Sequence, residues 1–250
     1  MIVFGTRPES IKMAPVIKEL HKHHDQFNYC ICVTAQHKQL LDPILTLFKI
    51  KPNYDLNIMR KNQSLECITT TALMKLGEIL EQEKPDYLLI QGDTTKAMVA
   101  CLAAFYHKIT HIEAGLRTWN KLNPYPEEIN RKLINALSDL CFAHTEQAKQ
   151  NLLREGIDEK KIFIIGNTVI DALLEISENK LDLDKNTLKN IPFNNKKIVL
   201  VTAHRRESFG RPLRNICIAI KEIALCFPSD VILVYQVHPN LMSKRLFIRC

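Results

Sequence analysis

Charged side chains follow a series of short apolar runs in this sequence, at the point where each run ends. The run IVF leads into Arg7, with Lys12 one helical turn further on, whereas YLLIQ leads into Asp93 and THI leads into Glu113. Arginine and lysine side chains bind phosphate groups, and carboxylates transfer protons. These residue types predict acid–base chemistry on a substrate that carries a pyrophosphate.

Two later segments carry residues of the same kinds. KIVLVT is followed by His204 and Arg205, and a helical pattern opens with Glu127 directly after Pro126. A histidine suits proton transfer, and a further arginine suits a phosphate. The sequence contains neither a G-x-x-x-x-G-K-[ST] segment nor a G-x-G-x-x-G segment, which argues against a P-loop and against a nicotinamide cofactor. We therefore expect no cofactor and no metal.

The apolar runs alternate with helical patterns, which is typical of an α/β fold with a parallel sheet and helices on both faces. The runs are IVF and residues 29–34, 87–91, 110–113, 140–143 and 161–166. Ligands of such sheets bind outside the carboxyl ends of the strands, where helix N-termini also point. We therefore expect the charged residues to gather at that edge of the sheet.

Each candidate residue also has a structural explanation. Asp93 and the two threonines after it are good helix caps, and His204 could belong to a surface loop. A carboxylate that ends an apolar strand is costly to bury unless it is paired, so Glu113 either meets Arg117 or serves a site. The shared edge of the sheet favours a site, because independent structural accidents should not fall on one edge.

A polar stretch around residues 181–197 separates two parts of the chain. Residues 1–170 are expected to form an N-terminal Rossmann-like domain that carries most of the acid–base residues. Residues 171–250 contain only two clear strands, KIVLVT and DVILVY. Since a sheet usually has about 5 to 6 strands, we expect the second domain to be incomplete.

Composition indicates a globular protein with an ordinary core. The chain has 250 residues, of which 46% are hydrophobic, and its net charge of +7 comes from Lys and Arg residues that are interspersed with Asp and Glu. No apolar run approaches the roughly 20 residues of a membrane helix. We expect a cytoplasmic protein that binds neither nucleic acid nor a membrane, and whose eight cysteines are reduced.

Seven motifs, in their order and spacing, closely resemble the non-hydrolysing bacterial UDP-N-acetylglucosamine 2-epimerases. They are GTRPESIKMAP, VTAQHKQLLD, QGDTTKAMVACLAAFY, HIEAGLRT, PYPEEINR, IGNTVIDAL and VTAHRRESFGR. The resemblance implies two Rossmann-like domains of the glycosyltransferase-B type, with residues 171–250 as a partial UDP-binding domain. It also implies a homodimer that interconverts UDP-N-acetylglucosamine and UDP-N-acetylmannosamine for cell-envelope polysaccharides.

The same resemblance implies roles for individual residues. The family eliminates UDP to give 2-acetamidoglucal and then adds UDP back, and acid–base roles fall by motif on Asp93, Glu113 and Glu127. His204 would stabilise or protonate the departing diphosphate. Substrate binding falls on Arg7, Lys12, Arg117 and Arg205. Gln36, Gln39 and His238 match positions of an allosteric UDP-N-acetylglucosamine site, although Asn62 stands where regulated relatives have an arginine.

The sequence departs from the family pattern after Asn240. The family continues with a D-S-G-G…E-E stretch and a T-E-R-P-E stretch, which this sequence lacks. The departure predicts a truncated epimerase with little turnover by the chain alone. Two alternatives remain, a hydrolysing UDP-N-acetylglucosamine 2-epimerase and a non-catalytic protein that binds a nucleotide sugar.

Overall fold

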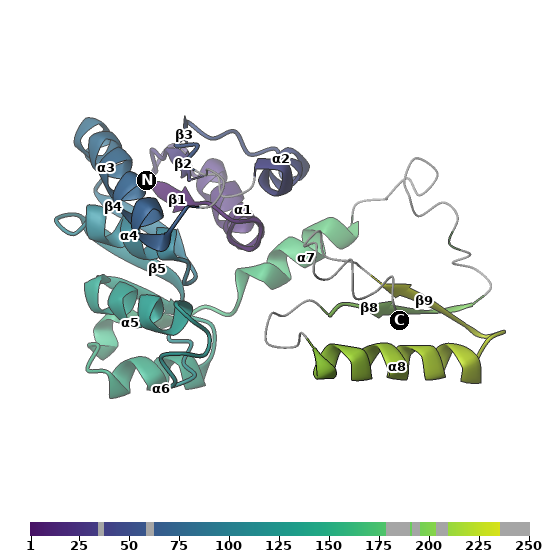
Figure 1. Ribbon diagram of the computed structural model, residues 1–250. Helices are drawn as coiled ribbons and strands as arrows, with labels where there is room; N and C mark the ends of the chain where they lie inside the picture. Colours follow the sequence, from purple (N-terminus) through teal and green to yellow (C-terminus); the bar gives the residue numbers. More distant parts are fainter. Residues whose placement is uncertain (35–37, 59–62, 179–190, 192–195, 204–209, 236–250) are drawn as a thin grey trace. The chain divides into compact units, whose positions relative to one another are not determined.

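The chain divides into two compact units, Met1–Asn179 and Lys180–Cys250 (Figure 1). The computed structural model describes residues 1–34, 38–58, 63–178, 191, 196–203 and 210–235. The division falls after Asn179 rather than after residue 170, because the helix α7 (Thr168–Glu178) packs against α1 (Arg7–Lys22). Lys18 of α1 and Glu175 of α7 form an ion pair of 2.9 Å there.

The first unit is built on a seven-stranded sheet in which every neighbouring pair of strands is parallel. The strand order is β3-β2-β1-β4-β5-β6-β7. The strands are β1 (Ile2–Phe4), β2 (Ile31–Val33), β3 (Tyr54–Asp55), β4 (Tyr87–Gln91), β5 (Lys108–Ala114), β6 (Leu140–Ala143) and β7 (Ile162–Ile164). The predicted α/β fold with a parallel sheet is confirmed.

Helices cover both faces of this sheet. The remaining helices of the first unit are α2 (Lys38–Leu47), α3 (Leu65–Glu83), α4 (Thr95–Ala103), α5 (Glu127–Leu137) and α6 (Glu146–Arg154), and a 3-10 turn spans Glu159–Lys161. Buried residues of α3, α4 and α5 form one core with Val3 and Ile90, whereas α1 and α2 form a second core with Ile2 and Phe4. Successive side chains of β1 therefore point into the two cores in turn. Figure 1 shows the two sets of helices on either side of the sheet.

A capping box starts α1, and its glutamate also connects the turn after β1 with the turn after β4. Thr6 accepts a hydrogen bond from the Glu9 amide, and one Glu9 carboxylate oxygen accepts from the amides of Gly5 at 2.7 Å and Thr6 at 2.8 Å. The other oxygen accepts from the Thr94 hydroxyl at 2.7 Å, and Thr94 is the N-cap of α4. Because Glu9 is buried, these bonds fix the ends of β1 and β4 relative to one another.

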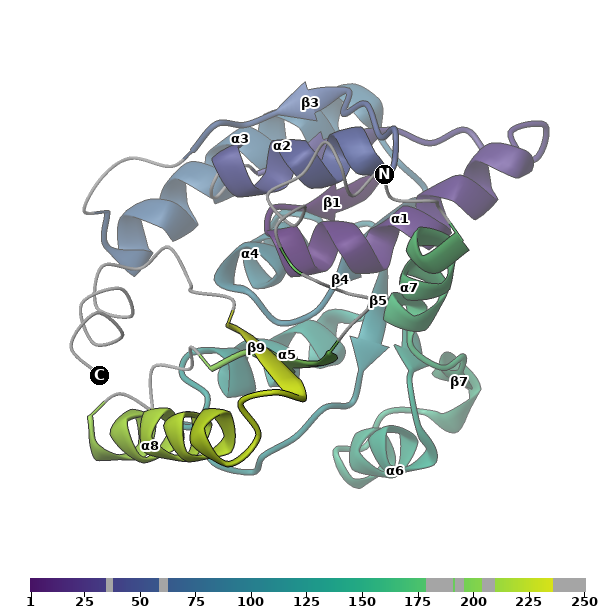
Figure 2. The ribbon, with the colours of Figure 1, turned by 90° about the vertical axis from the view of Figure 1, so that its right-hand side faces the viewer.

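The second unit contains β8 (Lys197–Val201), α8 (Arg211–Cys226) and β9 (Val231–Tyr235) (Figure 2). β8 and β9 are parallel, with Lys197 opposite Val231 and Val201 opposite Tyr235. Both strands that the sequence predicted for this part of the chain are therefore present. Among the described residues of the whole chain, no helix is long and apolar enough to cross a membrane.

Candidate active site

Glu113 is held at the carboxyl end of β5 in a strained backbone conformation. Its φ is +69°, and the register of β5 against β6 shifts between Ile112 and Ala114. A β-bulge of this kind re-aims a side chain, and a positive φ is rarely kept without a structural or functional reason. Gly115 has a φ of +86°, and a Cβ there would lie 2.3 Å from the Ala148 carbonyl oxygen, so only glycine fits.

Among the described residues, the Glu113 carboxylate binds three side chains, one from α1, one from β4 and one from the segment just before α7. The Lys12 ammonium donates to its two oxygens at 2.7 and 2.5 Å, the Gln91 amide donates at 2.5 Å and the Asn167 amide at 2.9 Å. The alternative that Glu113 pairs with Arg117 is therefore wrong, because its cationic partner is Lys12. The carboxylate is 11% exposed, so it is shielded but can still be reached from solvent.

Asp93 lies two residues after Gln91 and pairs with Arg131 of α5. The Arg131 Nε and Nη2 atoms lie 2.8 and 2.7 Å from Asp93 Oδ2. The Asn130 amide donates to the Asp93 carbonyl at 2.8 Å. The residue that caps α4 is Thr94, so the Asp93 carboxylate pairs with Arg131 and does not cap the helix.

The two neighbouring glutamates at the start of α5 have different environments. Glu128 is fully buried, and its oxygens accept from the Thr118 amide at 3.0 Å and the Trp119 amide at 2.9 Å. Burial alone would raise the pKa of the Glu128 carboxyl, but these hydrogen bonds and Arg131 together hold it below its usual value. Glu127 is half-buried, and within the described part of the chain its carboxylate has no partner.

The predicted cationic residues differ in how available they are. Arg7 is the first residue of α1 and is half-buried, and its guanidinium pairs with none of the described residues. Lys12 is engaged by Glu113. The side chain of Arg117 is fully buried, and its Nε donates to Glu155 Oε1 at 2.8 Å and its Nη1 to the Leu116 carbonyl at 2.6 Å. With no exposed guanidinium, Arg117 holds the chain after β5 rather than meeting a ligand.

Several predicted residues lie outside the described residues. These are His204, Arg205, Gln36 and His238, together with Asn62. Gln39 lies in α2, and only its backbone is described.

Sequence reasoning missed Arg131 and the role of Gln91. A signal for Arg131 was available, because Glu128 and Arg131 are spaced as neighbours on one helical face, and their Oε2 and Nη1 atoms lie 3.1 Å apart. No local pattern identifies Gln91, since its partner Glu113 lies on the neighbouring strand β5.

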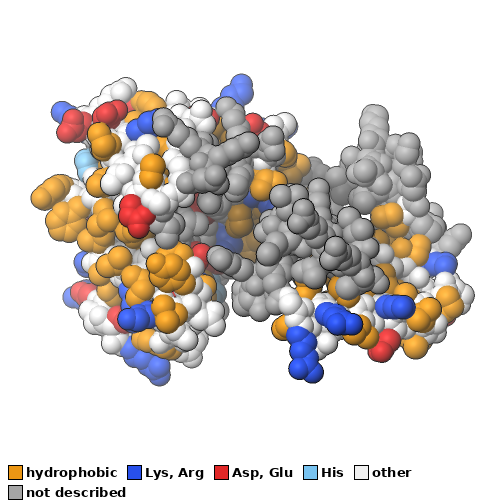
Figure 3. All heavy atoms as spheres, viewed as in Figure 1, with side chains coloured by type: hydrophobic (Ala, Val, Ile, Leu, Met, Phe, Trp, Pro, Cys, Tyr) orange, Lys and Arg blue, Asp and Glu red, His pale blue; other side chains and the backbone are white. Residues whose placement is uncertain are grey.

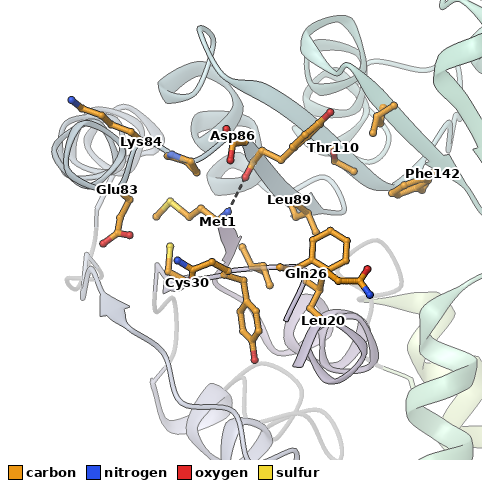
Figure 4. A pocket seen from close by; sticks show the side chains of 17 residues that line it. Met1, Leu20, Gln26, Cys30, Glu83, Lys84, Asp86, Leu89, Thr110 and Phe142 are labelled. Carbon is orange, nitrogen blue, oxygen red and sulfur yellow. Dashed lines mark hydrogen bonds between the residues drawn. The ribbon is translucent and has the colours of Figure 1, made fainter. Parts of the chain in front are cut away.

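A cavity of about 620 Å³ lies at the opposite edge of the sheet (Figure 4). It is lined by residues before or at the start of β1, β2 and β4, among them Met1, Cys30 and Asp86, and the Met1 ammonium donates to the Tyr87 carbonyl at 2.7 Å. Ligands of parallel α/β sheets bind at the carboxyl ends of the strands instead. We therefore place the candidate active site around Glu113 and Asp93.

The fold and this site define an α/β protein with a cluster of charged side chains at the carboxyl edge of a parallel sheet. Two carboxylates lie there beside a lysine and an arginine, and a third opens the adjacent helix α5. No group of three His, Cys, Asp or Glu side chains among the described residues could hold a metal ion.

Comparison with known proteins identifies the family. A family model described as UDP-N-acetylglucosamine 2-epimerase matches residues 18–249. The chain therefore belongs to the UDP-N-acetylglucosamine 2-epimerase family. It is 50% identical over 247 residues to the UDP-N-acetylglucosamine 2-epimerase of Yersinia pestis, covering 96% of this chain and 65% of that protein.

Solved structures agree with this assignment. The crystal structure of the Neisseria meningitidis UDP-GlcNAc 2-epimerase bound to UDP-GlcNAc matches with a TM-score of 0.90 and 47% identity, covering 99% of this chain and 68% of that one. A Staphylococcus aureus MnaA–UDP co-structure matches with a TM-score of 0.88 and 41% identity, covering 100% and 65%. The chain spans 62–66% of the length of the curated relatives that it matches.

The fold type extends to a more distant protein. The apo form of the lipopolysaccharide outer core galactosyltransferase WaaB matches with a TM-score of 0.52 at 9% identity, which shows the fold alone. The predicted glycosyltransferase-B type of fold is thereby confirmed.

Proposed function

We propose that this protein is a non-hydrolysing UDP-N-acetylglucosamine 2-epimerase that interconverts UDP-N-acetylglucosamine and UDP-N-acetylmannosamine. The observation that carries the proposal is the pair of carboxylates at the carboxyl edge of the sheet, Glu113 on Lys12 and Asp93 on Arg131. Family membership and the UDP-GlcNAc complex of the Neisseria meningitidis relative support it.

The chemistry explains why several carboxylates are needed. The proton on C2 of the sugar is not acidic, because no carbonyl adjoins that carbon in the ring. In the proposed route the bond between C1 and the diphosphate oxygen breaks as the C2 proton leaves, which gives UDP and 2-acetamidoglucal. The diphosphate then bonds to C1 again while a proton is delivered to the opposite face of C2. Two faces require at least two proton-transfer groups.

We assign these proton transfers to Asp93, Glu113 and Glu127. Asp93 and Glu113 are each held in one orientation by a cation and by neighbouring hydrogen bonds, which suits groups that must meet C2 in a defined geometry. Glu127 has no partner in the described part of the chain, so its carboxylate can approach the sugar without breaking an existing contact.

Cationic residues would hold the diphosphate. Arg7 lies at the N-terminus of α1, where the helix dipole also favours an anion, and its guanidinium pairs with none of the described residues. Lys12 lies about one turn further along α1. Its ammonium would stabilise the negative charge of the Glu113 carboxylate and of the departing diphosphate. We assign His204 and Arg205 to the same diphosphate. Arg117 supports the chain after β5, and Gln36, Gln39 and His238 remain proposed effector-binding residues.

The protein is proposed to act in the cytoplasm as a homodimer. Exposed hydrophobic side chains gather over α3, α4 and the turn that follows α4, as Figure 3 shows on this face of the first unit. They include Met74, Phe105 and Tyr106, and Tyr106 is 94% exposed. An apolar surface of this kind favours burial against a second copy. Tyr106→Asp should convert dimer to monomer in sedimentation, whereas Phe27→Asp, at another exposed site, should not.

Hydrogen exchange at C2 tests the proposed activity. The chain is incubated with UDP-N-acetylglucosamine in D2O. The proposed activity predicts deuterium at C2 together with UDP-N-acetylmannosamine, whereas the truncation expected from the sequence predicts little of either. Asp93→Asn should slow the exchange by about 10²-fold or more. Asp158→Asn, which changes an exposed carboxylate that caps the 3-10 turn, should leave the rate unchanged.

Two results would contradict the proposal. The unmodified chain could leave the C2 hydrogen in place, or Asp158→Asn could lose as much activity as Asp93→Asn. Release of free N-acetylmannosamine with UDP, and without UDP-N-acetylmannosamine, would instead identify a hydrolysing enzyme.

A further inference from the structure

His111 is a buried histidine in the middle of β5 that the proposed reaction does not use. Its side chain is enclosed by protein, and the residue is 1% exposed. The Nδ1 atom lies 2.5 Å from Asn135 Oδ1 of α5, and the Nε2 atom lies 2.8 Å from the Gly92 carbonyl oxygen. Both partners in this arrangement are acceptors, so the ring would need an N–H on each nitrogen.

A neutral ring cannot satisfy both acceptors, since it carries a single N–H. Burial lowers the pKa of His111, and the nearby Arg117 adds to this, whereas Asn135, Gly92 and Asp93 act in the opposite direction. The neutral form is therefore favoured at neutral pH. Asn135 Nδ2 is itself buried and finds no acceptor among the described residues.

Rotation of the Asn135 amide by 180° resolves both problems. The two ends of an amide have nearly the same shape, so the exchange of O and N requires no movement of other atoms. Nδ2 then donates to His111 Nδ1, and the ring donates from Nε2 to the Gly92 carbonyl. The unpaired atom becomes a carbonyl oxygen, which is tolerated more readily than an unpaired N–H.

Together with other contacts from α5, these hydrogen bonds fix the turn that carries Asp93. Gly92 has a φ of +79°, and its amide donates to the Ile112 carbonyl at 3.1 Å. Three residues of α5 act on the same turn: Asn130 holds the Asp93 carbonyl, Arg131 holds the Asp93 carboxylate, and Asn135 acts through His111 on the Gly92 carbonyl. The backbone and the side chain of the turn are thus fixed by one helix.

We propose that His111, set in its Nε2–H tautomer by Asn135, is a positioning residue that orients the Gly92–Asp93 turn for proton transfer by Asp93. The contribution to proton transfer rests on the proposed function of Asp93. The tautomer and the control of the turn do not depend on that function. They can therefore be tested separately on the same chain.

The tautomer is tested on the unmodified chain. In protein labelled with ¹⁵N-histidine at pH 7, long-range proton–nitrogen spectra should show a proton on Nε2 of His111 and none on Nδ1. Asn135→Asp replaces the donor by a carboxylate, so the ring should then carry protons on both nitrogens. A proton on Nδ1 in the unmodified chain would overturn the proposal.

Control of the turn is tested with variants of His111. The ¹³C carboxyl signal of Asp93, identified by its loss in Asp93→Asn, should shift in His111→Leu. It should return toward its original position in His111→Gln, because the glutamine amide can donate to the Gly92 carbonyl. If His111→Leu fails to fold, Asn135→Leu is used in its place. It keeps the imidazole ring but removes the side chain that sets the tautomer of His111, so the Asp93 signal should shift in this variant too.

Asn151→Leu provides a matched control. Asn151 is also a buried asparagine, and its amide donates to the carbonyl of a glycine, Gly115, at 2.9 Å. Its loss should leave the Asp93 signal in place. An Asp93 signal that is unchanged in folded His111→Leu, or that moves equally in Asn151→Leu, would overturn the proposal.

Kinetics connect the position of the turn to the reaction. Misplacement of a catalytic group should lower kcat about tenfold or more in His111→Leu, with KM changed less than about twofold and with recovery in His111→Gln. A fall in kcat without recovery in His111→Gln would contradict the positioning role. If the unmodified chain shows no C2 exchange, the proposed function fails, and the two spectroscopic tests still decide the role of His111.

Discussion

At the scale of single residues, the Lys12–Glu113 ion pair should stabilise the fold as well as the site. Both side chains are shielded, with 22% and 11% of their surface exposed. Lys12→Met removes a charged donor from a carboxylate that then keeps two amide donors among the described residues. We expect the free energy of unfolding, measured in urea, to fall by about 2 kcal/mol.

A surface pair provides the comparison for this change. Lys22 donates to Glu19 at 2.7 Å, but both side chains are largely exposed. Lys22→Met should therefore cost less than about 1 kcal/mol. Equal losses in the two variants would show that the protein gains nothing from shielding the Lys12–Glu113 pair.

Lys96 is expected to destabilise the protein at neutral pH. The residue is 4% exposed, and its ammonium has no partner within the described part of the chain. Burial lowers the pKa of Lys96 from 10.5 to about 8, although Glu9 acts in the opposite direction. Below pH 8 the ammonium is charged in both states and the full cost of burying it applies. Lys96→Met should raise the free energy of unfolding at pH 7, by at most about 3 kcal/mol.

The pH dependence gives the sign of this effect. Between pH 8 and 10.5 the unfolded chain binds the Lys96 proton and the folded chain does not, so stability rises with pH in that window. The difference between Lys96→Met and the unmodified chain should therefore shrink from pH 7 to pH 9.5 in denaturant titrations. A difference that is constant across this range would show that Lys96 titrates normally.

The sequence predicts which residue types lie at the site better than it predicts their partners. Asp93 and Glu113 are identifiable because each follows an apolar strand. The contact of Lys12 with Glu113, 101 positions away in the chain, is not encoded by any local pattern. Glu128 is buried and Glu127 is not, because α5 packs with one face against the turn that carries Asp93. The sequence of α5 alone does not show which of the two glutamates lies on that face.

At the scale of elements, the junction between β5 and α6 depends on a glycine. Gly115 has a positive φ, and a Cβ would meet the Ala148 carbonyl of α6 at 2.3 Å. Gly115→Ala should therefore lower the free energy of unfolding by about 2–5 kcal/mol, through backbone strain and through displacement of α6. Thermal and urea unfolding measure this loss.

Gly77 is the matched control for this substitution. It lies inside α3, and a Cβ there would have no neighbour within 4 Å. Gly77→Ala should raise the free energy of unfolding by about 0.5–1 kcal/mol, since alanine loses less conformational entropy in a helix. A destabilising Gly77→Ala, or a neutral Gly115→Ala, would contradict the role of the close approach between β5 and α6.

Strand prediction succeeded where a strand is an apolar run and failed where it is not. β4 and β6 coincide with the predicted runs at residues 87–91 and 140–143. β3 was missed, because Tyr54–Asp55 contains only one apolar residue and joins the sheet through pairing with β2. β5 is longer than expected, since Lys108 and Ala114 pair with neighbouring strands outside the apolar run.

At the scale of the whole molecule, the described acid–base residues all belong to the first unit. Their contacts with Lys12, Arg131 and Asn167 also lie within Met1–Asn179, as do the two cores on the faces of the sheet. The helix α7 belongs to this unit because it packs on α1. The sequence-based division did not place it there, because an apolar helical pattern does not indicate which element the helix contacts. Residues 1–179 should therefore fold without the rest of the chain.

Expression of residues 1–179 tests how the proposed function is divided between the units. We expect cooperative thermal unfolding within a few degrees of the full chain, because no described contact of the Glu113 and Asp93 groups is removed. We expect no exchange at C2 of UDP-N-acetylglucosamine, because His204 and Arg205, which we propose to bind the diphosphate, are absent. Elimination requires a bound leaving group, so carboxylates alone should not remove the C2 proton. Exchange by residues 1–179 at the rate of the full chain would place the diphosphate site on the first unit, with Arg7 as its main cation.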